Sequence, residues 1–196
     1  MNTKLHLGCG KRNFGSQWNH IDQIDAPHIV SHDVTRLPYA DNSIELIYCS
    51  HLISYFMPED MPSILKEWYR VLKPGGILRI ATPDYAKLFE AYKKRGDIAC
   101  VLGPLYGKMD NATHQPQIQE LLSDYPPGII HHKTCYDYHS LTNLLRENGF
   151  TDWEQYDHRT TEHGNTGERT DMYDDHSAAY IDGILISLNV ECYKPA

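Results

Sequence analysis

Two glycines and an acid near the amino end are the first residues whose types and spacing point to chemistry. Residues 4–10 read Lys-Leu-His-Leu-Gly-Cys-Gly, an alternating stretch typical of a short strand that breaks at Gly8 and Gly10. Glycine lets the backbone approach a ligand closely, because no Cβ stands in the way. A second short strand ends at Asp22, where an acid can accept hydrogen bonds from the two hydroxyls of a ribose. This pattern predicts a nucleoside-binding turn, with Asp25 as the weaker alternative to Asp22.

Two later stretches follow this turn in a recognisable order. Residues 33–48 contain Asp-Val-Thr-Arg-Leu-Pro, and residues 69–80 read Tyr-Arg-Val-Leu-Lys-Pro-Gly-Gly-Ile-Leu-Arg-Ile. With Leu-Gly-Cys-Gly at residues 7–10, they resemble the class I S-adenosylmethionine-dependent methyltransferases. The chain is most similar to the small predicted methyltransferases of surface-polysaccharide biosynthesis, over nearly its whole length. The full dinucleotide pattern G-x-G-x-x-G is not present, since Asn13 occupies the third glycine position.

The resemblance implies a fold, a cofactor and a reaction. The fold is a single Rossmann-like α/β domain over residues 1–196, with a mostly parallel sheet and an antiparallel last strand. The cofactor is S-adenosyl-L-methionine, and the reaction is methylation of a hydroxyl on a glycan or nucleotide-sugar precursor. Other small-molecule or lipid-like acceptors stay open, as does a catalytically inactive cofactor-binding partner of another transferase.

Cofactor contacts are carried over to the positions that match the family pattern. Asp22 is expected at the ribose and Asp33 at the adenine amino group, a donor that suits a carboxylate. The alternative role for Asp33 is capping of the turn that follows it. The predicted cofactor-binding residues are Leu7, Gly8, Cys9, Gly10, Asp22, Asp33, Val34, Ser50 and His51.

The segment after His51 departs from the family. Relatives usually continue His-x-x-Glu-His, whereas this chain has Ser54 and Tyr55 in place of the last two residues. If the Glu–His pair orients a ligand or acts in catalysis elsewhere, that role is lost here or carried by other residues. The departure keeps the inactive alternative open.

Methyl transfer to a hydroxyl requires alignment of the acceptor oxygen and, for a weakly acidic hydroxyl, a base. His132 matches a histidine that relatives carry on the acceptor side, and an imidazole titrates in the appropriate range. A loop histidine that only forms hydrogen bonds is the alternative. Asp84 and His176 are secondary catalytic candidates, because both are expected at the carboxyl ends of the strands.

Composition narrows the classes of partner. A formal net charge of −8 and a pI of about 5.8 argue against a broad nucleic-acid footprint. Five cysteines without a C-x-x-C pair are typical of reduced thiols, and no apolar run predicts membrane insertion, so a soluble cytoplasmic protein is expected. The 12 histidines lack zinc-site spacing. We therefore predict no metal, with Asp174 and Asp175 as the weighed alternative for Mg²⁺.

Periodicity predicts the elements that position these residues. Strands are expected at 4–8, 19–22, 28–31, 44–49, 77–82, 150–156 and 184–193, and helices at 58–73, 85–95 and 140–148, the last capped by Ser140. The connection from Gly10 to Asp22 is too short for a full crossover helix. Residues 96–137 and 157–182 are expected to form acceptor-side insertions, the first of loops and short helices.

Overall fold

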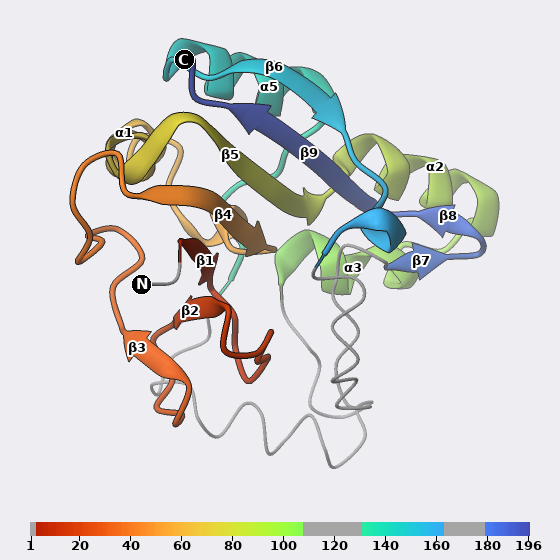
Figure 1. Ribbon diagram of the computed structural model, residues 1–196. Coiled ribbons are helices and arrows are strands. Elements are labelled where there is room, and N and C mark those ends of the chain that lie inside the picture. The colour runs from red at the N-terminus through yellow and green to blue at the C-terminus, as the bar shows by residue number, and fades with distance from the viewer. Residues whose placement is uncertain (1–2, 108–130, 163–178) are drawn as a thin grey trace.

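The computed structural model describes residues 3–107, 131–162 and 179–196, which contain a sheet of seven strands (Figure 1). The strand order is β3-β2-β1-β4-β5-β9-β6. β9 is antiparallel to both of its neighbours, and the other pairs are parallel. The strands are β1 (Lys4–Leu7), β2 (Trp18–Ile21), β3 (Ile29–Ser31), β4 (Ile44–Ser50), β5 (Leu72–Pro83), β6 (Thr151–Gln155) and β9 (Ser187–Tyr193). The predicted fold class is confirmed.

Helices follow the strands at two places. α1 (Met61–Val71) and α5 (Tyr138–Glu147) lie behind the sheet in Figure 1. α2 (Tyr85–Arg95), α3 (Ala99–Tyr106) and the small β7–β8 hairpin (Tyr180–Ile181 and Ile184–Leu185) gather at the end toward which β4 and β5 point. Short 3₁₀ turns, η1 (Ile53–Tyr55) and η2 (His158–Thr160), complete the described elements.

The two faces of the sheet differ in polarity. One face buries the apolar sides of α1 and α5, with Trp68 and Leu65 of α1 fully buried against Leu5 and Ile47. On the other face His6 is in register with Tyr48 of β4 and its ring stacks on Phe14 at 4.1 Å. Burying the polar side chain of His6 among aromatic rings makes this second face a mixed layer, so the aliphatic core lies on the α1–α5 side.

Most predicted elements are present, with two corrections. The residue that caps α5 is Asp137 and not Ser140. The Asp137 carboxylate accepts from the Ser140 backbone N–H at 2.7 Å, and the Ser140 hydroxyl accepts from the Asp137 backbone N–H. The predicted last strand, 184–193, is two strands: β8 pairs with β7, whereas β9 lies between β5 and β6 in the main sheet. The described part of residues 96–137, where loops and short helices were expected, contains the short helix α3, which accommodates Pro104 near its carboxyl end. As expected, residues 11–17 form turns and contain no helix.

Candidate active site

The chain runs from β1 to β2 on one side and pairs β1 with β4 on the other, so the strand order reverses between β1 and β4. In open α/β sheets ligands bind in the crevice at this topological switch point. The glycine turn follows β1, and Ser50 and His51 follow β4. Four of the predicted cofactor-binding positions therefore border one crevice: Gly8, Gly10, Ser50 and His51.

The two glycines of the turn meet different surroundings. Both have left-handed φ angles, +64° at Gly8 and +56° at Gly10. A Cβ on Gly8 would lie 2.9 Å from Leu52 Cδ1, so the Leu52 side chain would have to shift to admit another residue there. Among the residues that the structure describes, none would lie within 4 Å of a Cβ on Gly10. Gly10 therefore faces open space, where a ligand could approach the backbone.

Asp22 ties the end of β2 to this turn. Its Oδ2 accepts from the Gly10 N–H at 2.8 Å, and its Oδ1 accepts from the Ile24 N–H at 3.1 Å. The residue is only 9% exposed. Each carboxylate oxygen can accept more than one hydrogen bond, so the site can still take ribose hydroxyls. Asp25, the weaker alternative, is exposed.

Asp33 and Val34 form the turn after β3. The Asp33 carboxylate accepts from both the backbone and the hydroxyl of Thr35, at 2.8 and 2.6 Å, and these bonds lower its pKa. The Val34 side chain is buried, and its carbonyl accepts from the Trp68 indole at 2.8 Å. The capping interpretation of Asp33 is therefore visible in the structure, and its adenine contact stays a prediction.

Leu7 and Cys9 contribute to the turn from the core side. Both side chains are fully buried, so we expect any ligand contact from their backbones. Burial, together with the charge of Asp22, raises the pKa of the Cys9 thiol far above its usual range. Cys49 is equally buried, with its pKa raised for the same reason. Both cysteines are therefore small apolar residues of the core, without the lowered pKa of a reactive thiol.

Sequence patterns did not reveal the backbone geometry of His51. It has φ +53°, a left-handed conformation that non-glycine residues adopt infrequently. Its N–H donates to the Ala81 carbonyl at 2.7 Å, which holds the start of the η1 segment against β5. This turn directs residues 51–55 across the crevice.

Of the two residues that depart from the family pattern, Tyr55 contacts His132 and Ser54 binds the residue that follows it. The His132 ring packs edge-on against the Tyr55 ring, with centroids 4.6 Å apart. The Ser54 carbonyl accepts from the Lys133 N–H at 2.7 Å, and the Ser54 hydroxyl bonds to Thr82 at 2.9 Å. Residues 131–137 therefore pass along η1 toward the end of β5.

His132 also closes the carboxyl end of α3. Its Nδ1 lies 3.0 Å from the Pro104 carbonyl, and its backbone N–H donates to Tyr106 at 2.9 Å. A carbonyl can only accept, so Nδ1 carries the proton and Nε2 keeps the lone pair. Burial lowers the pKa of the imidazole. The ring is thus a neutral acceptor through Nε2 and a structural tie through Nδ1.

Asp84 stands at the end of β5 and caps α2. Its Oδ1 accepts from the N–H groups of Ala86 and Lys87 at 3.0 and 3.2 Å, and burial raises its pKa. Asp84 pairs with Tyr136, which brings the His132 segment beside it. His176, Asp174 and Asp175 lie outside the described residues. Within the described ranges no three His, Cys, Asp or Glu side chains gather as a metal site.

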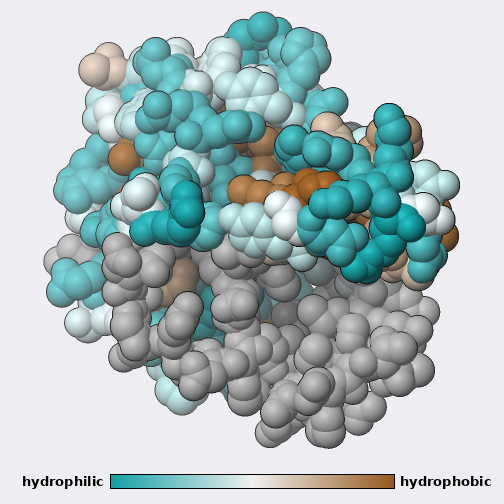
Figure 2. All heavy atoms as spheres, turned by 90° about the vertical axis from the view of Figure 1, so that its right-hand side faces the viewer, coloured by the Kyte–Doolittle hydropathy of each residue, from teal (hydrophilic) through white to brown (hydrophobic). Residues whose placement is uncertain are grey.

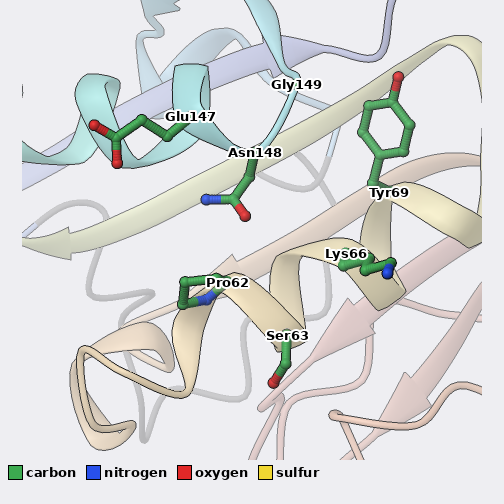
Figure 3. Close-up of a pocket in the computed structure, with 7 residues that line it drawn as sticks. All are labelled: Pro62, Ser63, Lys66, Tyr69, Glu147, Asn148 and Gly149. Carbon is green, nitrogen blue, oxygen red and sulfur yellow. The ribbon is translucent and has the colours of Figure 1, made fainter.

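A separate cavity of about 610 Å³ lies between α1 and the end of α5 (Figure 3). The labelled side chains come from Pro62 to Tyr69 on α1 and from Glu147 to Gly149. None of the predicted site residues within the described ranges lines it. The crevice at β1 and β4 is thus the candidate site on chemical grounds.

Comparison with known proteins supports the same cofactor. Residues 10–80 match the family model described as a methyltransferase domain. A solved S-adenosylmethionine-dependent methyltransferase of Methanosarcina mazei superposes with a TM-score of 0.54 at 16% identity, covering 98% of this chain and 92% of that one. The fold is that of the class I S-adenosylmethionine-dependent methyltransferases. The family match and this fold imply S-adenosyl-L-methionine as the cofactor.

Two curated relatives of this methyltransferase-fold chain match over part of its length. Malonyl-[acyl-carrier protein] O-methyltransferase 1 of Coxiella burnetii is 28% identical over 61% of the chain and 31% of the relative. Demethylmenaquinone methyltransferase of Bacteroides fragilis is 35% identical over 50% of the chain and 40% of the relative. The chain thus spans less than half the length of these relatives.

The residues in the crevice fit the cofactor. The open space above Gly10 accommodates a ligand against the backbone. The Asp22 carboxylate beside it can accept hydrogen bonds from the hydroxyls of a ribose. Asp33 is exposed at the neighbouring strand end. When bound, S-adenosylmethionine supplies a methyl group activated on a sulfonium.

Proposed function

We propose that the protein is an S-adenosylmethionine-dependent methyltransferase whose cofactor lies over Gly10 and beside Asp22. One observation carries this assignment. The hydrogen bond from the Gly10 N–H to the Asp22 carboxylate, at 2.8 Å, joins the glycine turn to the acid proposed to bind the ribose, at the switch point of the sheet. A turn that faces open space next to a carboxylate is the arrangement that a nucleoside requires.

The proposed acceptor atom is an oxygen, in a sugar hydroxyl of a glycan or nucleotide-sugar precursor. The relative from Coxiella burnetii is named as an O-methyltransferase, which supports oxygen. The sugar rests on the resemblance of the sequence to methyltransferases of polysaccharide biosynthesis. Another small-molecule or lipid-like acceptor is the alternative, and the Bacteroides fragilis relative, named for demethylmenaquinone, supports a lipid-like one.

His132 is the proposed general base. Its protonated Nδ1 is held by Pro104, and its burial keeps Nε2 neutral and able to accept a proton. We expect His132→Ala to lower the turnover rate about a hundredfold, with the affinity for cofactor nearly unchanged. The rate of the wild type should fall in acid as the imidazole protonates. Because burial lowers the pKa of His132, this acid limb of the pH–rate profile should lie below pH 6.5, the ordinary value for histidine.

Two further variants separate catalysis from structure. His132→Asn keeps a donor for the Pro104 carbonyl but offers no base, so it should be as slow as His132→Ala. The matched control is His131→Ala, because His131 is the exposed neighbour on the same segment. An Asn variant with near-normal turnover and an unchanged acid limb would remove His132 from the mechanism and direct attention to Asp84.

The acceptor class is tested by transfer of a labelled methyl group. The protein is incubated with methyl-labelled S-adenosylmethionine and, separately, with nucleotide-hexoses, a demethylated quinol and an acyl carrier protein thioester. We expect label in the nucleotide-hexose or in a glycan made from it. Label only in the quinol would replace the sugar by a lipid-like acceptor.

The inactive alternative rests on the replacement of the family's Glu–His pair by Ser54 and Tyr55. Against it stands the contact of both residues with the His132 segment, which retains a titratable group on this side of the crevice. Cofactor binding without methyl transfer to any of the three acceptor classes would favour the inactive partner.

A further inference from the structure

Helices α2 and α3 expose an unusual amount of apolar surface. Of the ten exposed large apolar side chains among the described residues, six fall within residues 85–106. Three lie on α2 at spacings of four and three, and three follow at spacings of four along the turn and α3. They are Tyr85, Phe89, Tyr92, Ile98, Leu102 and Tyr106.

These six side chains do not belong to the core between α2 and α3. The buried sides of the two helices, Leu88, Ala91 and Val101, pack together with Ile186. Phe89 and Ile98 are each 57% exposed. Figure 2 views the side on which α2 and the β7–β8 hairpin lie, and it shows apolar atoms bordered by hydrophilic ones. We call the six exposed side chains the α2–α3 face.

The net charge of the α2–α3 segment is opposite in sign to that of the whole protein. Residues 85–106 contain four cations and two anions, a net charge of +2, whereas the whole chain carries −8. α3 contains no charged residue. The cations Lys93, Lys94 and Arg95 close α2, where they also complement the helix dipole. A cationic and apolar segment on an acidic protein favours an anionic partner.

Neighbouring groups bind three of the four cations, and counting Asp182 lowers the net charge from +2 to +1, still opposite in sign to that of the whole chain. Asp182 binds Arg95 at 2.6 Å, and its carbonyl accepts from Lys94. Lys87 pairs with Glu90 on the outer side of α2. Lys93 lies with its Nζ 5.7 Å from the Phe89 ring, and its long apolar stem lets it cover that ring while its charge stays in water.

We propose that the α2–α3 face docks on a membrane surface that contains anionic lipid. Tyrosine and phenylalanine rings suit the headgroup region, exposed Ile98 and Leu102 suit the acyl boundary, and the lysines suit the lipid phosphates. The aliphatic pair argues against a sugar, which stacks on aromatic rings. Among the described helices none has the length and apolar character to cross a bilayer, so the α2–α3 segment would lie on its surface.

This location bears on the candidate active site. Asp84 caps the start of α2, and His132 is bonded to the end of α3. Both helices therefore begin or end at a proposed catalytic residue. A protein that docks through this face would present the crevice to an acceptor held at the membrane, whether a quinol or a lipid-linked sugar.

The test is co-sedimentation of the full chain with vesicles. Vesicles of phosphatidylcholine with about one-third phosphatidylglycerol should bind the wild type, and pure phosphatidylcholine vesicles should bind it several-fold less. The variant Phe89→Ser with Ile98→Ser should lose binding about tenfold or more. The matched control is Val30→Ser with Met57→Ser, because these side chains are exposed away from the face.

Cofactor affinity and thermal stability of each variant are measured beside the vesicles, so that failure of docking is separate from failure of the site. If the double variant is unstable, Ile98→Ser alone is used and should weaken binding several-fold. A wild type that stays in solution with anionic vesicles would overturn the proposal. So would a concentration-dependent dimer that the double variant abolishes, because the face would then bind a second copy.

Discussion

Gly8 and Gly10 share a left-handed backbone, yet only one of them faces the space that a ligand would occupy. The sequence predicts the same outcome for substituting either: lost binding in a folded protein. The structure separates them, because the Cβ of a residue at position 8 would strike Leu52. Substitution of Gly8 is therefore expected to disturb the packing under the turn as well as the site.

Gly10→Val tests the turn more cleanly. The variant should remain folded, with a cost of about 1–2 kcal/mol for the left-handed backbone, and should lose detectable binding of S-adenosylhomocysteine. Gly8→Val should lower the midpoint of thermal unfolding more strongly. Circular dichroism and calorimetry measure both quantities. Full binding by the Gly10 variant would mean that the ligand does not lie over this turn.

His20 makes the stability of the protein depend on pH. Its Nε2 accepts from the Phe14 N–H at 2.8 Å, and burial lowers its pKa to about 4. The unfolded chain binds this proton at about pH 6.5 and the native state does not, so stability is complete above pH 6.5 and falls as the pH drops toward 4. The loss should be on the order of 3 kcal/mol.

A variant isolates this contribution. His20→Gln keeps an acceptor for the Phe14 N–H but cannot protonate, so its stability should change less between pH 6.5 and 4 than that of the wild type. Chemical unfolding at a series of pH values is the measurement. Parallel stability curves for the two proteins in this window would contradict the role of His20.

At the scale of elements, α5 begins with a capping box. Asp137→Ala removes the acceptor for the Ser140 N–H and should lower the free energy of unfolding by about 1 kcal/mol. Glu147→Ala is the control, because Glu147 is an exposed acid in the last turn of the same helix and should be nearly neutral. Urea unfolding measures both, and equal effects would argue against the cap.

Most elements were predictable because local patterns specify them. The amphipathic spacing of Ile64, Leu65 and Trp68 predicts α1, and Pro74-Gly75-Gly76 marks its end within a few residues. The cap of α5 was misassigned because Asp137 and Ser140 are both good cap residues three positions apart. α3 was not located within its stretch, since Pro104 and two glycines weaken any helical signal there.

At the scale of the whole molecule, the sheet order was predictable only through family resemblance. Parallel pairs such as β1–β4 join residues about forty positions apart, and no local pattern in this chain specifies them. The cofactor residues follow from the same resemblance. The contact between Tyr55 and His132 could not be predicted, because it depends on the left-handed turn at His51 and on how residues 131–137 cross η1.

The central claim is that S-adenosylmethionine binds beside Asp22. The most direct measurement is calorimetric titration with S-adenosylhomocysteine of the wild type, Asp22→Ala and the control Asp25→Ala, because Asp25 is an exposed acid three residues further along the chain. The account predicts that Asp22→Ala weakens binding by about 1.5–3 kcal/mol through lost hydrogen bonds to a charged acceptor, and that Asp25→Ala binds like the wild type. Wild-type affinity in Asp22→Ala, or no binding by the wild type itself, would contradict it.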